Sequence, residues 1–156
     1  MRTHTLEAEQ WLPRPPEDVF PFFADAFNLE RITPPLLRFR VVTPRPIAMR
    51  EGTRIDYRLR IHGVPVRWQS EITVWEPPFR FVDEQRRGPY QLWSHEHTFV
   101  ERDGGTLCRD VVTYAAPGGP LVHRLLVGPD VRKIFAYRRE ALAGLFGAPR
   151  ECGRSI

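Results

Sequence analysis

Apolar and polar positions alternate with a period of two through most of the middle of the chain, from residue 36 to residue 117. This is the spacing of side chains on one face of a β-strand, and turn residues interrupt it at intervals typical of an antiparallel meander. The first ten or so residues alternate in the same way. The pattern predicts seven strands, at residues 3–12, 36–43, 53–62, 65–75, 80–86, 90–101 and 106–115.

Helical spacing predicts two short helices after the first strand. Prolines and acidic residues at positions 13–18 suit the first turn of a helix, and apolar residues then recur at helical intervals from 19 to 27. Asp25 or Asn28 is a candidate N-cap for a second helix. The two prolines at 34 and 35 must end it, because proline cannot donate a backbone hydrogen bond.

A third helical pattern predicts a long helix within residues 121–146, and Gly128-Pro129 should kink or interrupt it near its start. One largely apolar stripe of this helix contains Val131, Ile134, Phe135, Arg138, Leu142, Leu145 and Phe146.

The order of these elements predicts how they pack. A strongly bent antiparallel sheet has a concave face that must be covered, and the final helix is the only element long enough to cover it. We therefore expect an α+β fold: a seven-stranded, curved antiparallel sheet wrapped around a long C-terminal helix, with two short helices after the first strand.

Several local motifs accompany this order: Pro16-Glu17-Asp18-Val19-Phe20, Trp75-Glu76-Pro77-Pro78, Gly88-Pro89-Tyr90 and Trp93-Ser94-His95-Glu96-His97-Thr98-Phe99. Together, the order and the motifs resemble the START-like or SRPBCC superfamily, which includes the birch pollen allergen and polyketide cyclases/dehydrases. The resemblance implies a helix-grip fold with a ligand cavity between sheet and long helix, and one START-like domain over residues 1–149. Residues 150–156 are expected to form a flexible tail.

Composition narrows the choice of partner. The chain has 156 residues, 42% of them hydrophobic, and a formal net charge of +4. Almost all basic residues are arginines, spread singly along the strands, whereas a nucleic-acid surface gathers them, so we expect no nucleic-acid partner. No apolar run suits stable membrane insertion, the start of the chain has no signal-peptide core, and two cysteines form no disulfide framework. These features favour a cytoplasmic protein.

Turn residues predict which side chains face the concave side. A two-residue turn at Gly63-Val64 would pair Ile61 with Val66, Leu59 with Trp68, Tyr57 with Ser70 and Ile55 with Ile72. A type I′ turn at Asp103-Gly104 would pair Phe99 with Cys108, His97 with Asp110, His95 with Val112 and Trp93 with Tyr114. A three-residue loop at 87–89 would add Phe79, Phe81 and Asp83 to the same face.

His95-Glu96-His97 is the sharpest local feature, because residues two apart on a strand point the same way. Three interpretations follow. In the first, the histidines form structural hydrogen bonds. In the second, Asp110 orients His97 for acid/base exchange with a bound carbonyl compound. A zinc ion would need a third ligand from Asp110 or Asp83. Because no second His or Cys cluster accompanies the pair, we expect no metal and no cofactor.

We interpret the chain as a protein that binds or carries a small hydrophobic ligand of the lipid, polyketide or aromatic type. One alternative is a cyclase/dehydrase-like enzyme that uses His97 and Asp110; another is a protein-interaction or chaperone-modulating domain. The sequence leaves open whether the protein is an enzyme and predicts one set of ligand-binding residues: Tyr57, Trp68, Ser70, Phe81, Trp93, His95, His97, Tyr114 and Phe135.

Overall fold

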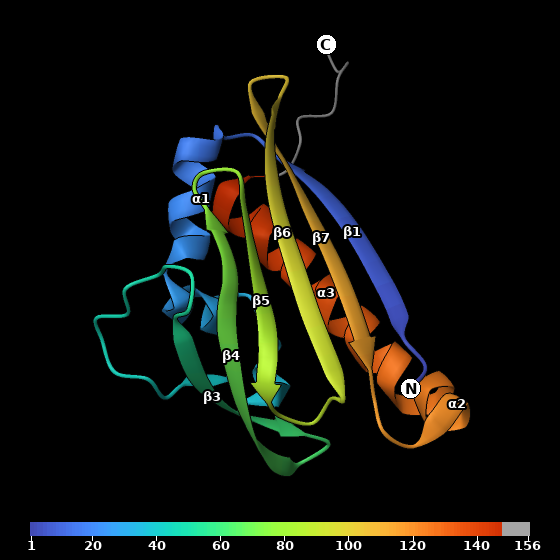
Figure 1. Ribbon diagram of the computed structural model, residues 1–156. Coiled ribbons are helices and arrows are strands. Elements are labelled where there is room, and N and C mark those ends of the chain that lie inside the picture. Colours follow the sequence, from blue (N-terminus) through green and yellow to red (C-terminus); the bar gives the residue numbers. More distant parts are fainter. Residues whose placement is uncertain (148–156) are drawn as a thin grey trace, which may run out of the picture.

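The protein is built on one seven-stranded antiparallel sheet. The computed structural model describes residues 1–147, so the tail expected at 150–156 lies outside the described residues. The strands are β1 (His4–Leu12), β2 (Arg40–Val41), β3 (Arg54–Ile61), β4 (Val64–Glu76), β5 (Arg80–Arg87), β6 (Leu92–Arg102) and β7 (Gly105–Ala115). Their order across the sheet is β1-β7-β6-β5-β4-β3-β2, and the sheet is strongly bent (Figure 1).

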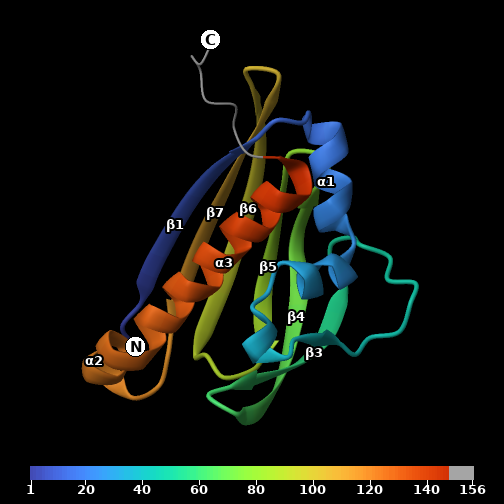
Figure 2. The ribbon, with the colours of Figure 1, turned by 180° about the vertical axis from the view of Figure 1, so that it is seen from behind.

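All helices lie on one face of this sheet (Figure 2). They are α1 (Pro16–Ala24), the 3₁₀ turns η1 (Ala26–Arg31) and η2 (Pro35–Leu37), α2 (Gly119–Val122), the π-helical turn η3 (His123–Val127) and α3 (Gly128–Phe146). Helix α3 runs diagonally across the concave face, and α1 covers the end of that face near the C-terminus of α3. The expected helix-grip architecture is confirmed.

The first helices follow the expected local chemistry. Pro16 occupies the first turn of α1 together with two acidic residues, Glu17 and Asp18, which complement the helix dipole. The second short helix, η1, is capped by Asp25, whose Oδ1 accepts a hydrogen bond from the backbone N–H of Phe27 at 3.0 Å. Of the two candidate caps, Asp25 is therefore the one used.

The C-terminal helix continues through Gly128-Pro129 instead of breaking there. The adjustment is the π turn η3, in which the N–H of Gly128 donates to the carbonyl of His123, five residues earlier. Pro129 lacks the N–H that a regular α-helix needs, and the wider turn before it lets the backbone continue. The predicted interruption is thus a local change of helix type.

The predicted strand at 36–43 is wrong over most of its length. Only Arg40 and Val41 pair with β3, whereas residues 35–37 form η2 and Leu36 is 88% exposed. Pro34 and Pro35 fix their own φ angles and remove two donors from any ladder, which confines pairing to the residues that follow.

The β6–β7 hairpin has the predicted register. Trp93 pairs with Tyr114 and His97 with Asp110 across a turn in which Asp103 and Gly104 both have positive φ. These are the dihedral angles that a type I′ turn requires.

The predicted β3–β4 register is wrong by two residues. The turn residues are His62 and Gly63, both with positive φ, so Tyr57 pairs with Trp68 and Leu59 with Val66. Because side chains alternate with period two, a shift of two keeps every residue on its predicted face.

The inward placement of Phe79 is also wrong. Its N–H donates to the carbonyl of Glu76 in the turn before β5, and its side chain is 65% exposed. The strand begins at Arg80, so the alternation that would point Phe79 inward does not reach it.

The buried side chains of the described residues form three apolar clusters rather than one. The largest joins α1, the end of α3 and the sheet, and includes Leu12, Phe20 and Phe99. A second gathers around Trp93 between β6, β7 and the start of α3. A third lies under η1 around Tyr57.

Candidate functional site

A cavity of about 500 Å³ lies between these clusters on the concave face. The sheet supplies most of its wall, α3 supplies Asp130, Lys133, Ile134 and Arg138, and η1 and η2 supply Leu29 and Leu37. The lining is mainly apolar. Leu36, His62 and Gly63 also line the cavity and are exposed, so it opens between η2 and the tip of the β3–β4 hairpin.

Most of the predicted ligand-binding residues line this cavity. They are Tyr57, Trp68, Ser70, Phe81, Trp93, His95 and His97. Tyr114 and Phe135 do not line it: both pack in the cluster around Trp93, and the hydroxyl of Tyr114 contacts His123 Nε2 at 2.8 Å. Successive turns of α3 direct Ile134 and Arg138 toward the cavity, which leaves Phe135 facing a neighbouring part of the sheet.

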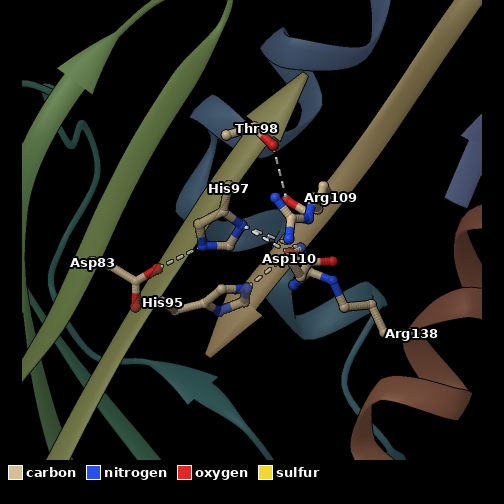
Figure 3. Close-up of polar contacts among 7 residues, drawn as sticks. All are labelled: Asp83, His95, His97, Thr98, Arg109, Asp110 and Arg138. Carbon is tan, nitrogen blue, oxygen red and sulfur yellow. Dashed lines mark hydrogen bonds and ion pairs between the residues drawn. The ribbon is translucent and has the colours of Figure 1, made fainter. Parts of the chain in front are cut away.

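A buried polar cluster lies at the inner wall of the cavity. Asp83 on β5, His95 and His97 on β6 and Arg138 on α3 line the cavity, and Asp110 on β7 lies behind them (Figure 3). His97 Nε2 lies 2.7 Å from Asp83 Oδ2, and His95 Nε2 lies 2.8 Å from Asp110 Oδ1. Since an ionised carboxylate only accepts hydrogen bonds, the imidazole nitrogen facing it carries the proton.

The predicted pairing of His97 with Asp110 is looser than expected. His97 Nδ1 is 3.3 Å from Asp110 Oδ1 and 3.4 Å from Arg138 Nη2, and its shorter contact goes to Asp83. Both nitrogens of His97 therefore have protein neighbours. This differs from the predicted arrangement, in which one nitrogen would face the ligand. The two imidazoles stack with 3.6 Å between ring centroids.

Burial and charge act on the two histidines in opposite ways. Burial, followed by the proximity of His97, lowers the pKa of His95 to about 4, so His95 is neutral near pH 7. Burial also opposes charging of His97, but the hydrogen bonds to Asp110 and Asp83 outweigh it and raise the pKa of His97. One histidine thus favours its neutral form and its neighbour the charged form.

The two carboxylates stay ionised despite burial. Desolvation alone would raise the pKa of Asp110, but the charge of Arg138 and the histidine hydrogen bonds hold it well below its usual range. Desolvation likewise opposes ionisation of Asp83, and its hydrogen bond to His97 lowers the pKa.

Arg138 is the member of the cluster that the sequence reasoning did not assign to the site. It is 8% exposed, its Nη2 is 3.2 Å from Asp110 Oδ1, and its Nε is buried without a hydrogen-bond partner among the described residues. The signal was present, because an arginine in the apolar stripe of a helix implies a buried charge, which needs a counter-charge.

Two further polar groups face the ligand space from β3 and β4. The indole N–H of Trp68 donates to Ser70 Oγ at 2.9 Å, and Ser70 is 3% exposed. Burial, aided by nearby aspartates, raises the pKa of Tyr57, so its hydroxyl remains protonated. An apolar wall with a few fixed polar groups is the usual composition of a small-molecule site.

The family follows from a comparison of sequences. Residues 12–143 match the model of the family described as polyketide cyclase / dehydrase and lipid transport. The chain belongs to this family. The match supports a START/polyketide cyclase-like ligand-binding domain. No curated protein sequence matches the chain.

Solved structures share the fold at low sequence identity. Ara h 8.0201 superposes with a TM-score of 0.69 at 20% identity, covering 93% of this chain and 98% of its own. The ZhuI aromatase/cyclase from a Streptomyces strain gives 0.68 at 16% identity, covering 92% and 93%. A START superfamily protein from Mycobacterium smegmatis gives 0.66 at 10% identity, covering 91% and 99%.

Among residues 1–147, no helix combines the length and the apolar character needed to cross a bilayer.

Proposed function

We propose that the protein binds and carries one small, largely apolar molecule in the cavity beneath α3. The observation that supports this most directly is the volume of about 500 Å³, within the range of roughly 300–1,000 Å³ typical of small-molecule sites. A lipid, a polyketide or an aromatic compound has the required apolar character. The polar cluster and the hydroxyls of Tyr57 and Ser70 would fix the orientation of its polar group.

The hollow interior also bears on the interaction-domain alternative. A domain that acts only through its surface needs no internal space, and a void costs stability because its lining atoms lose packing partners. The division of the core into three clusters around a cavity therefore favours ligand binding.

A titration with Nile red, a neutral apolar dye, tests this proposal. Trp68 and Trp93 both line the cavity, so binding should quench tryptophan emission and enhance dye emission with one site per chain. Ser70→Leu would place extra volume in the cavity and should weaken dye binding at least tenfold. Arg67→Leu, on the outer face of the same strand, is the matched control and should bind like the wild type. Equal dye binding by all three proteins would overturn the proposal.

A second candidate is an enzyme of the cyclase/dehydrase type, favoured by the presence of Asp83, His95 and His97 on the cavity wall. In this scheme His95 replaces His97 as the base. The Nε2–H of His95 donates to Asp110, and the unprotonated Nδ1 of His95 has no hydrogen-bond partner among residues 1–147. The candidate requires His95→Gln to abolish turnover of a bound polyketide while the compound still binds. Turnover that survives this change would remove His95 as the base.

A further inference from the structure

Three side chains on the cavity wall converge in a way that the apolar-ligand proposal does not use. Asp83, His95 and His97 each offer one ligand atom, and these atoms all lie within 4.8 Å of one another. They come from the adjacent strands β5 and β6, which fix their spacing, and all three line the large cavity. Two imidazoles and one carboxylate form a donor set suited to zinc and related transition metals.

Asp110 holds both imidazoles from the opposite side. Its Oδ1 is 2.8 Å from His95 Nε2 and 3.3 Å from His97 Nδ1. Asp110 does not line the large cavity; it lines a smaller space of about 180 Å³ on the other side of the cluster. Metal-binding histidines are typically held this way, with the second nitrogen donating to a carboxylate outside the coordination sphere.

The remaining imidazole nitrogens are those not held by Asp110. His97 Nε2 lies 2.7 Å from Asp83 Oδ2, so these two atoms already lie together, and a metal ion would displace the proton of the hydrogen bond between them. His95 Nδ1 has no hydrogen-bond partner among residues 1–147 and belongs to a ring that stacks on His97. The two imidazoles and the carboxylate of Asp83 therefore lie side by side (Figure 3), and all three residues line the cavity.

The charge of the cluster favours a cation at this point. The carboxylates of Asp83 and Asp110 outnumber the single guanidinium of Arg138, so in the metal-free protein a proton on His97 supplies the balance; all five side chains are largely buried. A buried excess of negative charge requires compensation, either by a proton on an imidazole or by a metal ion.

We propose that Asp83, His95 and His97 bind one divalent transition-metal ion of the zinc type, with Asp110 as the positioning carboxylate behind both histidines. This reverses the expectation of no metal and no cofactor drawn from the sequence. All three ligands face the cavity, so the coordination positions that they leave open are directed at its contents. An oxygen atom of a bound molecule is the group that would fill one of them.

A titration of the full, chelator-treated chain with Co²⁺ tests the site, because Co²⁺ reports low coordination numbers through visible absorption and Zn²⁺ should displace it. We expect one Co²⁺ per chain. His95→Gln and His97→Gln should abolish the absorption, and Asp83→Asn, which keeps the shape of the side chain, should weaken binding at least tenfold. His4→Gln and His62→Gln, which change histidines outside the cluster, are the matched controls and should retain full binding.

A fourth variant separates a metal site from a purely structural network. Asp110→Asn leaves all three ligands in place and should weaken Co²⁺ binding by about 10–100-fold, the usual effect of losing such a supporting group. Circular dichroism identifies any variant that does not fold, in which case Asp83→Asn decides. Absence of Co²⁺ binding below millimolar concentration, or binding unaffected by Asp83→Asn, would overturn the proposal. Because the probe is the metal alone, the outcome is independent of the dye titration.

Discussion

His62, at the tip of the β3–β4 hairpin, contacts Asp130 in the first turn of α3, with 2.8 Å between Nε2 and Oδ2. Both residues line the cavity near its opening, and the contact joins the two elements that border it. The side chain of His62 is 59% exposed and that of Asp130 is 29% exposed. An exposed side-chain contact of this kind contributes no more than an exposed ion pair does, about 0.2–1 kcal/mol, so it can open readily.

We predict that His62→Ala speeds ligand exchange. Loss of a contact of this strength corresponds to rates increased by up to about fivefold, since 1.4 kcal/mol is a factor of ten. Stopped-flow release of Nile red measures the rate. The control is Arg58→Ala, an exposed change on β3 at a residue that does not line the cavity. An unchanged release rate in His62→Ala would mean that the contact does not limit passage.

The packed and hollow parts of the interior should respond differently to the same substitution. Leu12 is fully buried in the largest apolar cluster, whereas Leu59 borders the cavity and is 8% exposed. Leu12→Ala should lower the free energy of unfolding by about 3–5 kcal/mol, the usual cost of a new void in a packed core. Leu59→Ala only enlarges an existing space and should cost about 1–2 kcal/mol. Urea denaturation of the ligand-free proteins measures both; equal costs would contradict a hollow interior.

Arg138 should be essential to stability because it neutralises a buried carboxylate. Arg138→Leu would leave Asp110 without its cation and should cost about 3–5 kcal/mol. It also removes a guanidinium that lies 5.2 Å from the centre of the Phe23 ring. Combining Arg138→Leu with Asp110→Asn should destabilise the protein less than the sum of the two single changes, because the unpaired charge is gone. Strictly additive losses in urea denaturation would show that the two residues do not interact.

The sequence predicted the architecture because its strongest signals are local. A type I′ turn requires positive φ at two consecutive residues, and Asp103-Gly104 adopts these angles readily. The turn therefore fixes the whole β6–β7 register. The β3–β4 turn used His62 where a glycine was expected first, and no local rule favours histidine at positive φ strongly enough to reveal this. The faces were still predicted correctly because the error was an even number of residues.

The candidate site was less predictable because its contacts cross between elements. Alternation places His95, His97 and Asp110 on one face, but the twist of the sheet decides which carboxylate reaches which nitrogen, and that is why Asp110 lies closer to His95 than to His97. Helical periodicity identified the stripe that contains Phe135 and Arg138. The stripe is broader than the cavity, and helical periodicity could not predict which of its residues would face the cavity.

The three apolar clusters border a cavity, so the proposed ligand would occupy a space that the chain itself leaves open. A molecule in the cavity would touch side chains of more than one cluster, including Phe81, Trp93 and Tyr57, and so would act as the missing centre of the core. Its binding energy then adds to the folding energy, by about 2.7 kcal/mol when the free ligand is at a hundred times its Kd. The melting temperature of the protein would therefore rise with the concentration of the proposed ligand, and the protein would be least durable where that molecule is scarce.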